Sequence, residues 1–181
     1  MKVDIEEKIE IPKDVQIKVD RSLIQAKGSK GDVSRKLLHP KIKISVQENQ
    51  IMISSKKATK REKKIIGTFK AHLKNMLKGV VEPFVYKLKI CSSHFPMTAS
   101  VKDNEFGVQN FLGESIPRTL KLMPGVNVKV EGSEIIVESP DKELAGQTAA
   151  SIEQLCKITN RDRRIFQDGI YIVSKSGKEI K

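Results

Sequence analysis

The chain repeats one pattern of apolar positions, and this repeat limits the folds open to it more than any other feature. Residues 42–46 alternate apolar and polar side chains, and residues 126–130 do the same 84 positions later. The apolar residues of 51–53 and 135–137 keep that offset. Two short alternating runs joined by a polar break are typical of a β-hairpin. The chain therefore contains two copies of a hairpin, which indicates a duplicated folding unit.

A helix is expected after the hairpin in each copy. Thr59 and Glu62 form a capping box, and Asp141 is the matching N-cap candidate in the second copy. Gly79 is placed where a C-terminal helix glycine is expected. Residues at the spacing of one helix face follow both caps, namely Ile65, Ile66, Phe69, Leu73, Met76 and Leu77 in the first copy and Leu144, Thr148, Ile152 and Leu155 in the second.

The two helices align at an offset of 79, so the first copy has five additional residues between hairpin and helix. Further alternating runs at 3–11, 15–19 and 23–27 add strands to the first copy. These elements predict an α+β fold of two tandem similar domains, each an antiparallel sheet packed against one main helix. The boundary is expected between Gly79 and Pro83, which gives domains of residues 1–82 and 83–181.

Positive charge is concentrated in the first copy. The chain has 34 Lys and Arg against 22 Asp and Glu, a net charge of +12, which favours a polyanionic partner. Residues 1–82 hold 20 basic and 10 acidic side chains, whereas residues 83–181 hold 14 and 12. Six cations fall in and beside the additional segment, Lys56, Lys57, Lys60, Arg61, Lys63 and Lys64. Such a cluster favours salt-dependent attraction without sequence register.

The connection after the second helix combines three kinds of side chain that contact RNA. Guanidinium groups bind phosphate oxygens in pairs, amides hydrogen-bond to nucleotide edges, and an aromatic ring stacks on a base. The residues concerned are Asn160, Arg161, Arg163, Arg164, Phe166 and Gln167. The alternative interpretation is an ordinary solvated loop. Aromatic residues make up only 4% of the chain and Trp is absent, so folded RNA fits better than a single strand held by stacking.

Two further segments leave alternatives open. The turn Gly28-Ser29-Lys30-Gly31 is interpreted as a tight turn or as an anion cradle, although it lacks the spacing of a Walker loop. Residues 106–118 predict a strand, a turn and a strand. Within them, Asn110 and Arg118 bond to RNA or to backbone, and Phe111 is either a core residue or an exposed contact.

Other classes of function find little support in the chain. His39, His72 and His94 are scattered, and no nucleophilic triad or carboxylate pair can be recognised. Cys91 and His94 supply half a metal site without a second pair, so no metal or cofactor is expected. Cys91 and Cys156 are interpreted as small core residues. No apolar run suits a membrane span or signal peptide, so we expect a cytoplasmic protein. A basic protein-interaction or general RNA-binding module remains the alternative.

Four stretches stand out when the chain is read as a whole. They are Asn-Phe-Leu-Gly-Glu at 110–114, Pro-Gly-Val at 124–126, Asp-Lys-Glu-Leu-Ala-Gly-Gln at 141–147 and Arg-Ile-Phe-Gln-Asp-Gly-Ile-Tyr at 164–171. Together they resemble large-subunit ribosomal protein six in its archaeal and eukaryotic form. The resemblance covers essentially the whole chain, including the duplication. Bacterial members of that family often have Pro at the position of Ser29, which leaves the rigidity of this turn open.

The resemblance implies a non-enzymatic constituent of the large ribosomal subunit. Its implied partners are large-subunit rRNA near the sarcin-ricin stem, neighbouring large-subunit ribosomal proteins and, transiently, translational GTPases. The implied RNA contacts in the second domain are Lys157, Asn160, Arg161, Arg163, Arg164, Phe166, Gln167, Asp168, Gly169 and Lys175. Secondary contacts to RNA or protein are expected at Lys30, Lys56, Lys57, Lys60, Arg61, Lys63, Lys64, Asn110 and Arg118.

Overall fold

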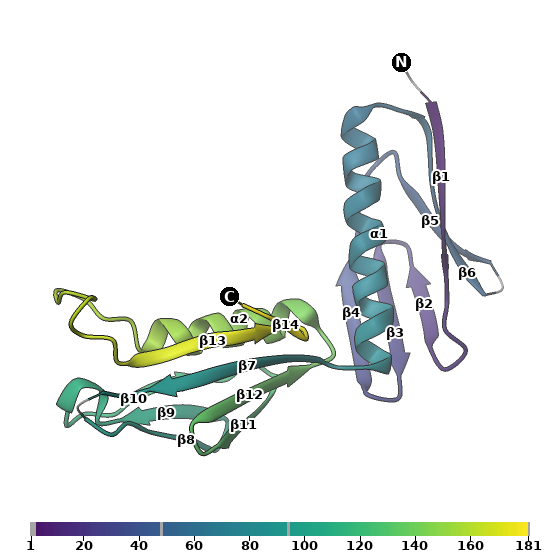
Figure 1. Ribbon diagram of the computed structural model, residues 1–181. Helices are drawn as coiled ribbons and strands as arrows, with labels where there is room; N and C mark the ends of the chain where they lie inside the picture. Colours follow the sequence, from purple (N-terminus) through teal and green to yellow (C-terminus); the bar gives the residue numbers. More distant parts are fainter. Residues whose placement is uncertain (1–2, 48, 94, 181) are drawn as a thin grey trace. The chain divides into compact units, whose positions relative to one another are not determined.

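A computed structural model describes residues 3–47, 49–93 and 95–180 of the chain. The chain divides into two compact units, residues 1–83 and 84–181 (Figure 1). Each unit contains antiparallel strands and one main α-helix, which confirms the predicted α+β class and the internal duplication. Neither α-helix in the described ranges has the length and apolarity that crossing a membrane requires.

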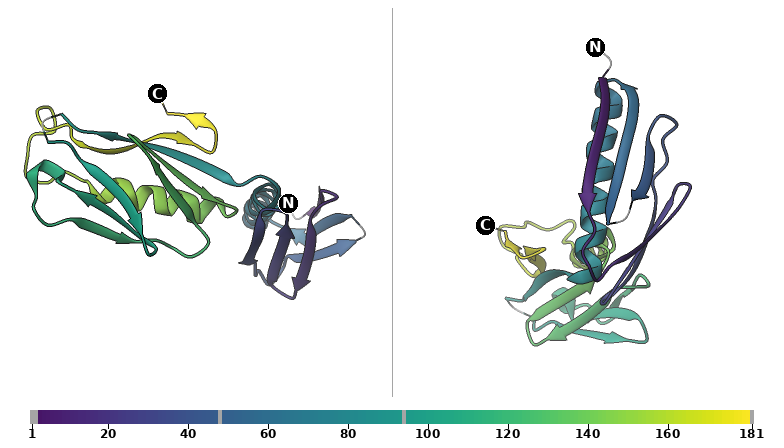
Figure 2. Two further views of the ribbon diagram at one scale, coloured as in Figure 1. Left: turned by 90° about the horizontal axis from the view of Figure 1, so that it is seen from below. Right: turned by 90° about the vertical axis from the view of Figure 1, so that its right-hand side faces the viewer.

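Unit 1, residues 1–83, consists of two three-stranded sheets and one long helix (Figure 2). The first sheet has the order β1-β6-β5, with β1 at Val3–Glu10, β5 at Lys43–Gln47 and β6 at Gln50–Ala58. The second has the order β2-β3-β4, with β2 at Gln16–Asp20, β3 at Leu23–Gly28 and β4 at Gly31–Lys36. The helix α1, Lys60–Val81, packs against strands of both sheets and encloses one core with them.

Unit 2, residues 84–181, repeats this plan and extends it. Its larger sheet has the order β11-β12-β7-β13-β14, with β7 at Phe84–Cys91, β11 at Asn127–Glu131, β12 at Glu134–Ser139, β13 at Gly169–Lys175 and β14 at Lys178–Glu179. The smaller sheet has the order β10-β9-β8, with β8 at Thr98–Lys102, β9 at Glu105–Gln109 and β10 at Arg118–Lys121. A short 3₁₀ turn, η1 at Phe111–Gly113, precedes β10, and the helix α2 is Lys142–Leu155.

The strand registers show how closely the two copies correspond. Ile44 lies opposite Ile53 in the β5–β6 hairpin, and Val128 lies opposite Val137 in the β11–β12 hairpin. Both partners differ by the same 84 positions that separate the apolar patterns in the sequence. A slip of one residue would turn every buried side chain to the solvent face, so the apolar pattern holds this register in both units.

The five additional residues of the first copy lengthen two elements instead of forming a loop. Strand β6 continues through residues 56–58, and β1 pairs with it as far as Ala58. Helix α1 starts seven residues before Gly67, whereas α2 starts four residues before the aligned Gly146. The cations of this segment are therefore carried by a strand end and by the first turns of a helix, both of which are rigid elements.

The two helices bury slightly different faces. In α1 the buried side chains include the predicted Ile66, Phe69, Leu73, Met76 and Leu77. In α2 they are Ala145, Thr148, Ala149 and Ile152, whereas the predicted Leu144 and Leu155 are only half-buried. The two alanines have little side chain beyond Cβ, so this face can approach the sheet closely. Leu155 still packs against the core of unit 2, so of the four predicted residues only Leu144 departs from the buried face.

The end of α1 also differs from the prediction. The helix continues past Gly79 and ends at the C-cap Glu82, immediately before Pro83. Val80 is fully buried, and its carbonyl oxygen accepts a hydrogen bond of 3.0 Å from the backbone N–H of Lys30. This packing keeps the last turn helical, while proline disfavours helical backbone in the residue before it. Tertiary contact thus overrides the tendency of Gly79 to stop a helix.

Gly28 makes this contact with the end of α1 possible. A Cβ atom at Gly28 would lie 2.6 Å from the carbonyl oxygen of Val80 and 2.9 Å from its Cβ. Strands β3 and β4 meet here in a two-residue turn, with Gly28 opposite Gly31. Because the backbone N–H of Lys30 is bonded to the helix, the segment serves as a packing turn.

We predict that Gly28→Ala destabilises the protein by about 1–3 kcal/mol, because the added methyl group overlaps helix backbone. Gly67→Ala is the matched control, since it lies in α1 with nothing within 4 Å of its new Cβ. That change should stabilise the helix by about 0.5–1 kcal/mol. Urea unfolding of the two variants measures both effects. A Gly28→Ala protein as stable as the wild type would contradict the packing described here.

Candidate nucleic-acid interface

The connection between α2 and β13, residues 156–168, contains most of the predicted RNA-contacting residues. It is buried at its two ends, Cys156 and Asp168, and largely exposed between them. Burial raises the pKa of the Cys156 thiol to about 11, so this cysteine stays protonated, and its burial confirms the predicted core position. The connection is therefore anchored twice and presents its middle to solvent.

Asp168 forms the second anchor. Its carboxylate accepts hydrogen bonds from the backbone N–H of Ser93 at 2.6 Å and from the Ser93 hydroxyl at 2.5 Å. Ser93 follows β7, and β7 pairs with β13 at Cys91 and Gly169. A carboxylate with such partners, 2% exposed, holds the end of the connection against the sheet. Asp168 and Gly169 are thus buried residues that fix the C-terminal end of the connection, whereas the exposed residues precede them in the sequence.

A turn built on Asp162 shapes the middle of the connection. The Asp162 carboxylate accepts from the backbone N–H of Arg164 at 2.9 Å, and the Asp162 carbonyl accepts from the N–H of Phe166 at 2.9 Å. The Arg164 guanidinium also pairs with this carboxylate at 2.7 Å, and these bonds lower the pKa of Asp162. Asn160 precedes the turn with a positive φ of 59°, a backbone conformation that asparagine tolerates well.

Internal contacts also order the aromatic and amide side chains of the connection. The Arg161 guanidinium lies over the Phe166 ring, 4.9 Å from its centroid. Gln167 donates from its amide to the carbonyl of Arg164 at 3.3 Å, and the Tyr171 hydroxyl donates to the carbonyl of Gln167 at 3.1 Å. The Arg161–Phe166 contact therefore holds both side chains in place within the connection.

Of the three arginines in the connection, Arg163 is the most open to a ligand. Its side chain is exposed and makes no hydrogen bond or ion pair with the residues that the structure describes. With Tyr171 it lines two neighbouring hollows of about 350 and 700 Å³. Burial raises the pKa of Tyr171, and the charge of Arg163 acts against this rise, which places the two side chains near each other. Arg163 therefore offers all its N–H donors between two surface depressions.

The segment before β10 lies beside this connection. Arg118 donates to the Glu114 carboxylate at 2.6 and 2.8 Å and to the carbonyl of Leu155, at the end of α2, at 2.7 Å. Its guanidinium also covers the Phe111 ring at 4.4 Å. The hydrogen bond from Arg118 lowers the pKa of Glu114, and the charges of Arg118 and Arg161 lower it further. Arg118 is consequently engaged in joining this segment to α2.

The remaining predictions for residues 106–118 divide between core and surface. Phe111 is 1% exposed and belongs to the core of unit 2. Asn110 has a positive φ of 60°, and its amide donates to the carbonyl of Pro96 at 3.1 Å. Asn110 and Arg118 therefore make the backbone contacts that the sequence left as one of two alternatives.

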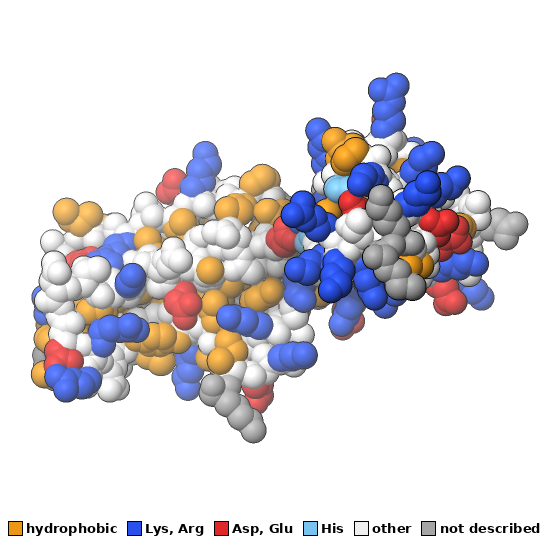
Figure 3. All heavy atoms as spheres, turned by 90° about the horizontal axis from the view of Figure 1, so that it is seen from above, with side chains coloured by type: hydrophobic (Ala, Val, Ile, Leu, Met, Phe, Trp, Pro, Cys, Tyr) orange, Lys and Arg blue, Asp and Glu red, His pale blue; other side chains and the backbone are white. Residues whose placement is uncertain are grey.

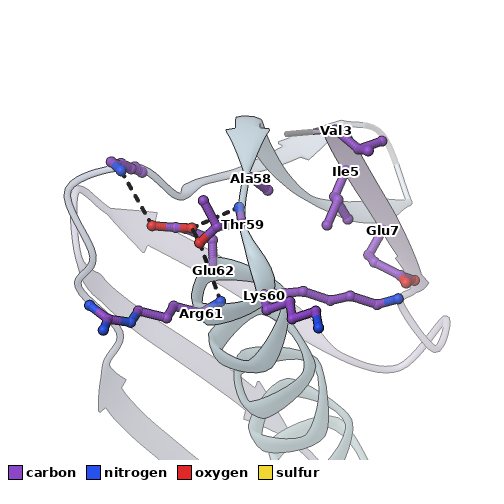
Figure 4. Close-up of a pocket in the computed structure, with 10 residues that line it drawn as sticks. Val3, Ile5, Glu7, Ala58, Thr59, Lys60, Arg61 and Glu62 are labelled. Carbon is purple, nitrogen blue, oxygen red and sulfur yellow. Dashed lines mark hydrogen bonds and ion pairs between the residues drawn. The ribbon is translucent and has the colours of Figure 1, made fainter. Parts of the chain in front are cut away.

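The second group of cations surrounds the start of α1. Lys56 and Lys57 end strand β6, and Lys60, Arg61, Lys63 and Lys64 occupy the first turns of the helix, all six exposed. Three of them, Lys60, Arg61 and Lys63, line a hollow of about 1000 Å³ that Val3 and Ile5 of β1 also line (Figure 4). On the face seen in Figure 3, Lys and Arg side chains gather over unit 1. This cluster presents charge without the aromatic and amide groups of the connection in unit 2.

Glu62 organises the helix start within this cluster. Its carboxylate accepts hydrogen bonds from the Thr59 hydroxyl and, at 2.8 Å, from the Thr59 backbone N–H, which confirms the predicted capping box. Lys41 approaches the other carboxylate oxygen at 3.4 Å. The Thr59 hydroxyl, followed by the Thr59 N–H, lowers the pKa of Glu62 from 4.5 to about 2. The N–H of Arg61 in turn donates to the Thr59 hydroxyl at 3.3 Å, so the cap satisfies part of the helix start.

The structure brings together some of the predicted contacts and separates others. Residues 157–167 lie in one mostly exposed connection, and the charge of Arg161 helps to lower the pKa of Glu114 in the segment before β10. Lys175 lies at the far end of β13, roughly 20 Å along the strand from Gly169. Lys30 packs at the end of α1, whereas the other unit 1 cations surround its start, roughly 30 Å along the helix.

Three residues of this region were not among the predicted contacts. Asp162 shapes the turn, and the Asp-x-Arg spacing is a local signal that could have identified it. Ser93 holds Asp168 from 75 positions away, so only the β7–β13 pairing reveals it. Tyr171 closes one side of the hollows beside Arg163, and its place at the start of β13 was the available signal.

Metal-binding groups are not assembled in the described part of the chain, where no three His, Cys, Asp or Glu side chains gather closely enough to hold an ion. His94, half of the Cys91 and His94 pair considered above, lies outside the described residues. Cys91 is half-buried at the end of β7.

Comparison with known proteins supports the resemblance seen in the sequence. Residues 11–82 and 95–169 match the family described as ribosomal protein L6. The large ribosomal subunit protein uL6 of Methanococcus vannielii is 47% identical over 174 residues, covering 96% of both chains. The protein of the same name from Nanoarchaeum equitans (strain Kin4-M) is 45% identical over 184 aligned positions, covering 97% of this chain and 96% of the relative.

We predict that Glu62 contributes to the acid sensitivity of the fold. Its pKa is lower in the folded state than its ordinary 4.5, so its stabilising effect is present above pH 4.5 and is lost as pH falls towards about 2. Glu62→Gln should therefore lower stability near neutral pH, and the difference from wild type should shrink across that window. Urea unfolding at several pH values measures this difference. Glu131→Gln, at the exposed β11–β12 turn, is the control. A Glu62→Gln deficit that is constant with pH would contradict the prediction.

Proposed function

The chain belongs to the ribosomal protein L6 family, and from this premise we propose that it binds large-subunit rRNA through the connection between α2 and β13. Members of this family are structural proteins of the large ribosomal subunit. We further propose that the bound RNA is the region of the sarcin-ricin stem, beside the docking site of translational GTPases. The chain would then stabilise folded RNA near a factor-binding surface and perform no chemistry of its own.

The observation that carries this proposal is the anchored, arginine-bearing surface of the connection. Asp168 ties its end to Ser93, and the Asp162 turn orders its middle, so Arg161, Arg163 and Arg164 project from a fixed frame. Guanidinium groups in a fixed frame can match the spacing of phosphate oxygens, whereas mobile lysines provide charge alone. An ordered frame also reduces the conformational entropy that binding would cost.

The three arginines are not equivalent in this role. Arg163 has no competing partner among the described residues, so its binding to a phosphate displaces no internal bond. Arg164 must share or release the Asp162 carboxylate, because that pair is already formed at 2.7 Å. Arg161 can keep its place over Phe166 and still present its guanidinium edge. We therefore assign the largest individual contribution to Arg163.

Folded RNA fits this surface better than an extended single strand. The described part of the connection has one aromatic ring, Phe166, and Arg161 already covers it. Double-stranded and compact RNA is recognised mainly through phosphates and 2′-hydroxyl groups across the shallow groove. Asn160 and Gln167 supply amides suited to hydroxyl and base-edge contacts. In this proposal, unit 2 supplies specificity.

Unit 1 has a different part in this proposal. Its cations at the start of α1 lie on rigid elements but lack amide and aromatic groups beside them. Such a surface adds affinity through release of counterions, with little dependence on the RNA sequence or shape. Its other contacts in the subunit would be with neighbouring ribosomal proteins and, transiently, with a translational GTPase.

We predict that Arg163→Ala combined with Arg164→Ala weakens binding to an rRNA fragment containing the sarcin-ricin stem by about 1–3 kcal/mol per lost contact. A filter-binding titration at fixed salt measures this loss against an unrelated RNA stem of equal length. The variant should lose its preference for the ribosomal fragment. The single change Arg163→Ala should account for the larger share, since Arg164 has an internal partner.

A second double variant, Lys60→Ala with Lys64→Ala, removes the same charge from exposed positions of α1 and serves as the matched control. It should make the dependence of affinity on salt shallower while the preference for the ribosomal fragment remains. Full retention of affinity in the arginine variant, or equal loss of preference in both variants, would count against the proposal. The second result would indicate a basic protein that binds RNA by charge alone.

A further inference from the structure

Strands β1 and β7 are the same strand in the two copies of the fold. Ile9 of β1 lies opposite Ile51, and Leu88 of β7 lies opposite Ile135. The first residues of these pairs differ by 79 positions and the second by 84, the offsets that relate the two copies elsewhere. The edges of β1 and β7 can therefore be compared position by position.

The two strands differ at the outer edge, which is the edge that faces away from β6 in unit 1 and away from β12 in unit 2. β7 lies between β12 and β13, whereas among the described strands β1 pairs with β6 alone. The chain leaves α1 and enters β7 after only Glu82 and Pro83, so unit 1 has no segment in the place of β13. In an antiparallel strand every second residue directs its N–H and C=O away from its partner, so β1 presents a row of such groups at an open edge.

We propose that this edge of β1 accepts an extended segment of a partner protein as an added strand, in the place that β13 occupies in unit 2. In unit 2 the pairing of β13 reaches from Tyr86 to Cys91 of β7, which corresponds to residues 7–12 of unit 1. The partner segment carries Lys or Arg at alternate positions with apolar residues between them. The proposal does not involve the RNA-facing connection of unit 2.

Charge selects this partner over the alternatives. β1 carries the carboxylates of Asp4, Glu6, Glu7 and Glu10 against one ammonium group, on a chain whose net charge is +12. Glu7 pairs with Lys70 of α1 at 2.5 Å, which leaves Glu6 and Glu10 exposed on the other face of the strand. Opposite charges across paired strands stabilise a sheet and like charges oppose it. Lys41, Lys60, Arg61 and Lys63 line the hollow on the face of Val3 and Ile5, so the acidic groups open to a partner are Glu6 and Glu10 on the outer face. A strand with cations on that outer face and apolar residues on the other therefore fits the edge, and an RNA backbone does not.

Self-association through this edge is disfavoured for the same reason. Two copies of β1 paired with each other would bring a net acidic strand beside its own copy. Charged edge strands commonly prevent such pairing between identical chains. The acidic residues of β1 thus discriminate against a second copy while they permit a basic segment.

An apolar surface beside the edge offers the second half of the fit. Val3 is 50% exposed and Ile5 is half-buried, and both line the hollow between β1 and the start of α1 (Figure 4). A strand that continued past residues 7–12 to the start of β1 would place its own apolar side chains next to them on the same face of the sheet. In unit 2, Ile170 of β13 shows this arrangement, since it lies opposite Ile90 and is 1% exposed.

The test uses the full chain and the synthetic peptide Lys-Val-Lys-Ile-Lys-Val-Lys, followed by backbone amide NMR and hydrogen exchange. The net positive charge of the protein repels this peptide in general, so binding must reflect the local acidic edge. We expect amide shifts and slowed exchange confined to β1 and its neighbours. No binding, or shifts located elsewhere, would overturn the proposal.

Charge reversal sharpens the test. Glu6→Lys with Glu10→Lys changes two exposed side chains and should weaken the affinity for the lysine peptide about tenfold. The matching peptide Glu-Val-Glu-Ile-Glu-Val-Glu should then bind at β1 of the variant more tightly than at β1 of the wild type. Glu131→Lys with Glu134→Lys makes the same charge change at the exposed β11–β12 turn and should leave lysine-peptide binding nearly unchanged. If both variants lost the same affinity for the lysine peptide, net charge alone would explain the effect, and the proposal would be overturned.

Two further outcomes separate the alternative partners. Thermal unfolding of each variant shows that the fold is retained, and the gain for the glutamate peptide is a readout that misfolding cannot produce. Sedimentation of the wild type alone should show a monomer at concentrations used for the titration. Dimers that disappear in the Glu6→Lys and Glu10→Lys variant, or β1 amide shifts on addition of duplex RNA, would assign the edge to those partners and refute a basic peptide.

Discussion

The burial of one hairpin strand beneath one helix determines the rest of each unit. In unit 1, Ile51 and Ile53 are fully buried, and in unit 2 their counterparts Ile135 and Val137 are buried to the same degree. Each side chain removed from water in this way contributes about 1.5–3 kcal/mol before the entropy of ordering is counted. Because these residues sit at every second position, their burial also holds the strand register and orients the helix above it.

On this common scaffold the two copies have diverged at their ends. The second copy continues after α2 into the anchored connection and β13, which covers the edge of β7. The first copy instead lengthens β6 and the start of α1, and its β1 keeps an open edge. Duplication followed by such changes lets one half present arginines in a fixed frame and the other half present an acidic strand edge and a cluster of lysines.

The elements that depend on local pattern could be predicted from the sequence. The hairpins, the capping box at Thr59 and the N-cap at Asp141 follow from side chains a few positions apart, and the structure confirms them. Gly79 shows the limit of prediction from local pattern. The helix continues beyond it because Val80 is buried against a turn 50 residues earlier in the sequence. The anchor between Ser93 and Asp168 likewise joins residues that share no local signal. The exposed arginines were recognisable by type, but their internal partners were not.

We propose that the connection between α2 and β13, and not the cationic start of α1, makes the specific contact with large-subunit rRNA. Photo-crosslinking of the full chain to large-subunit rRNA within assembled particles, with the crosslinked peptides identified by mass spectrometry, distinguishes the two surfaces. We expect crosslinks within residues 157–167, to nucleotides of the sarcin-ricin region. Crosslinks confined to residues 56–64, with none in the connection of unit 2, would contradict it.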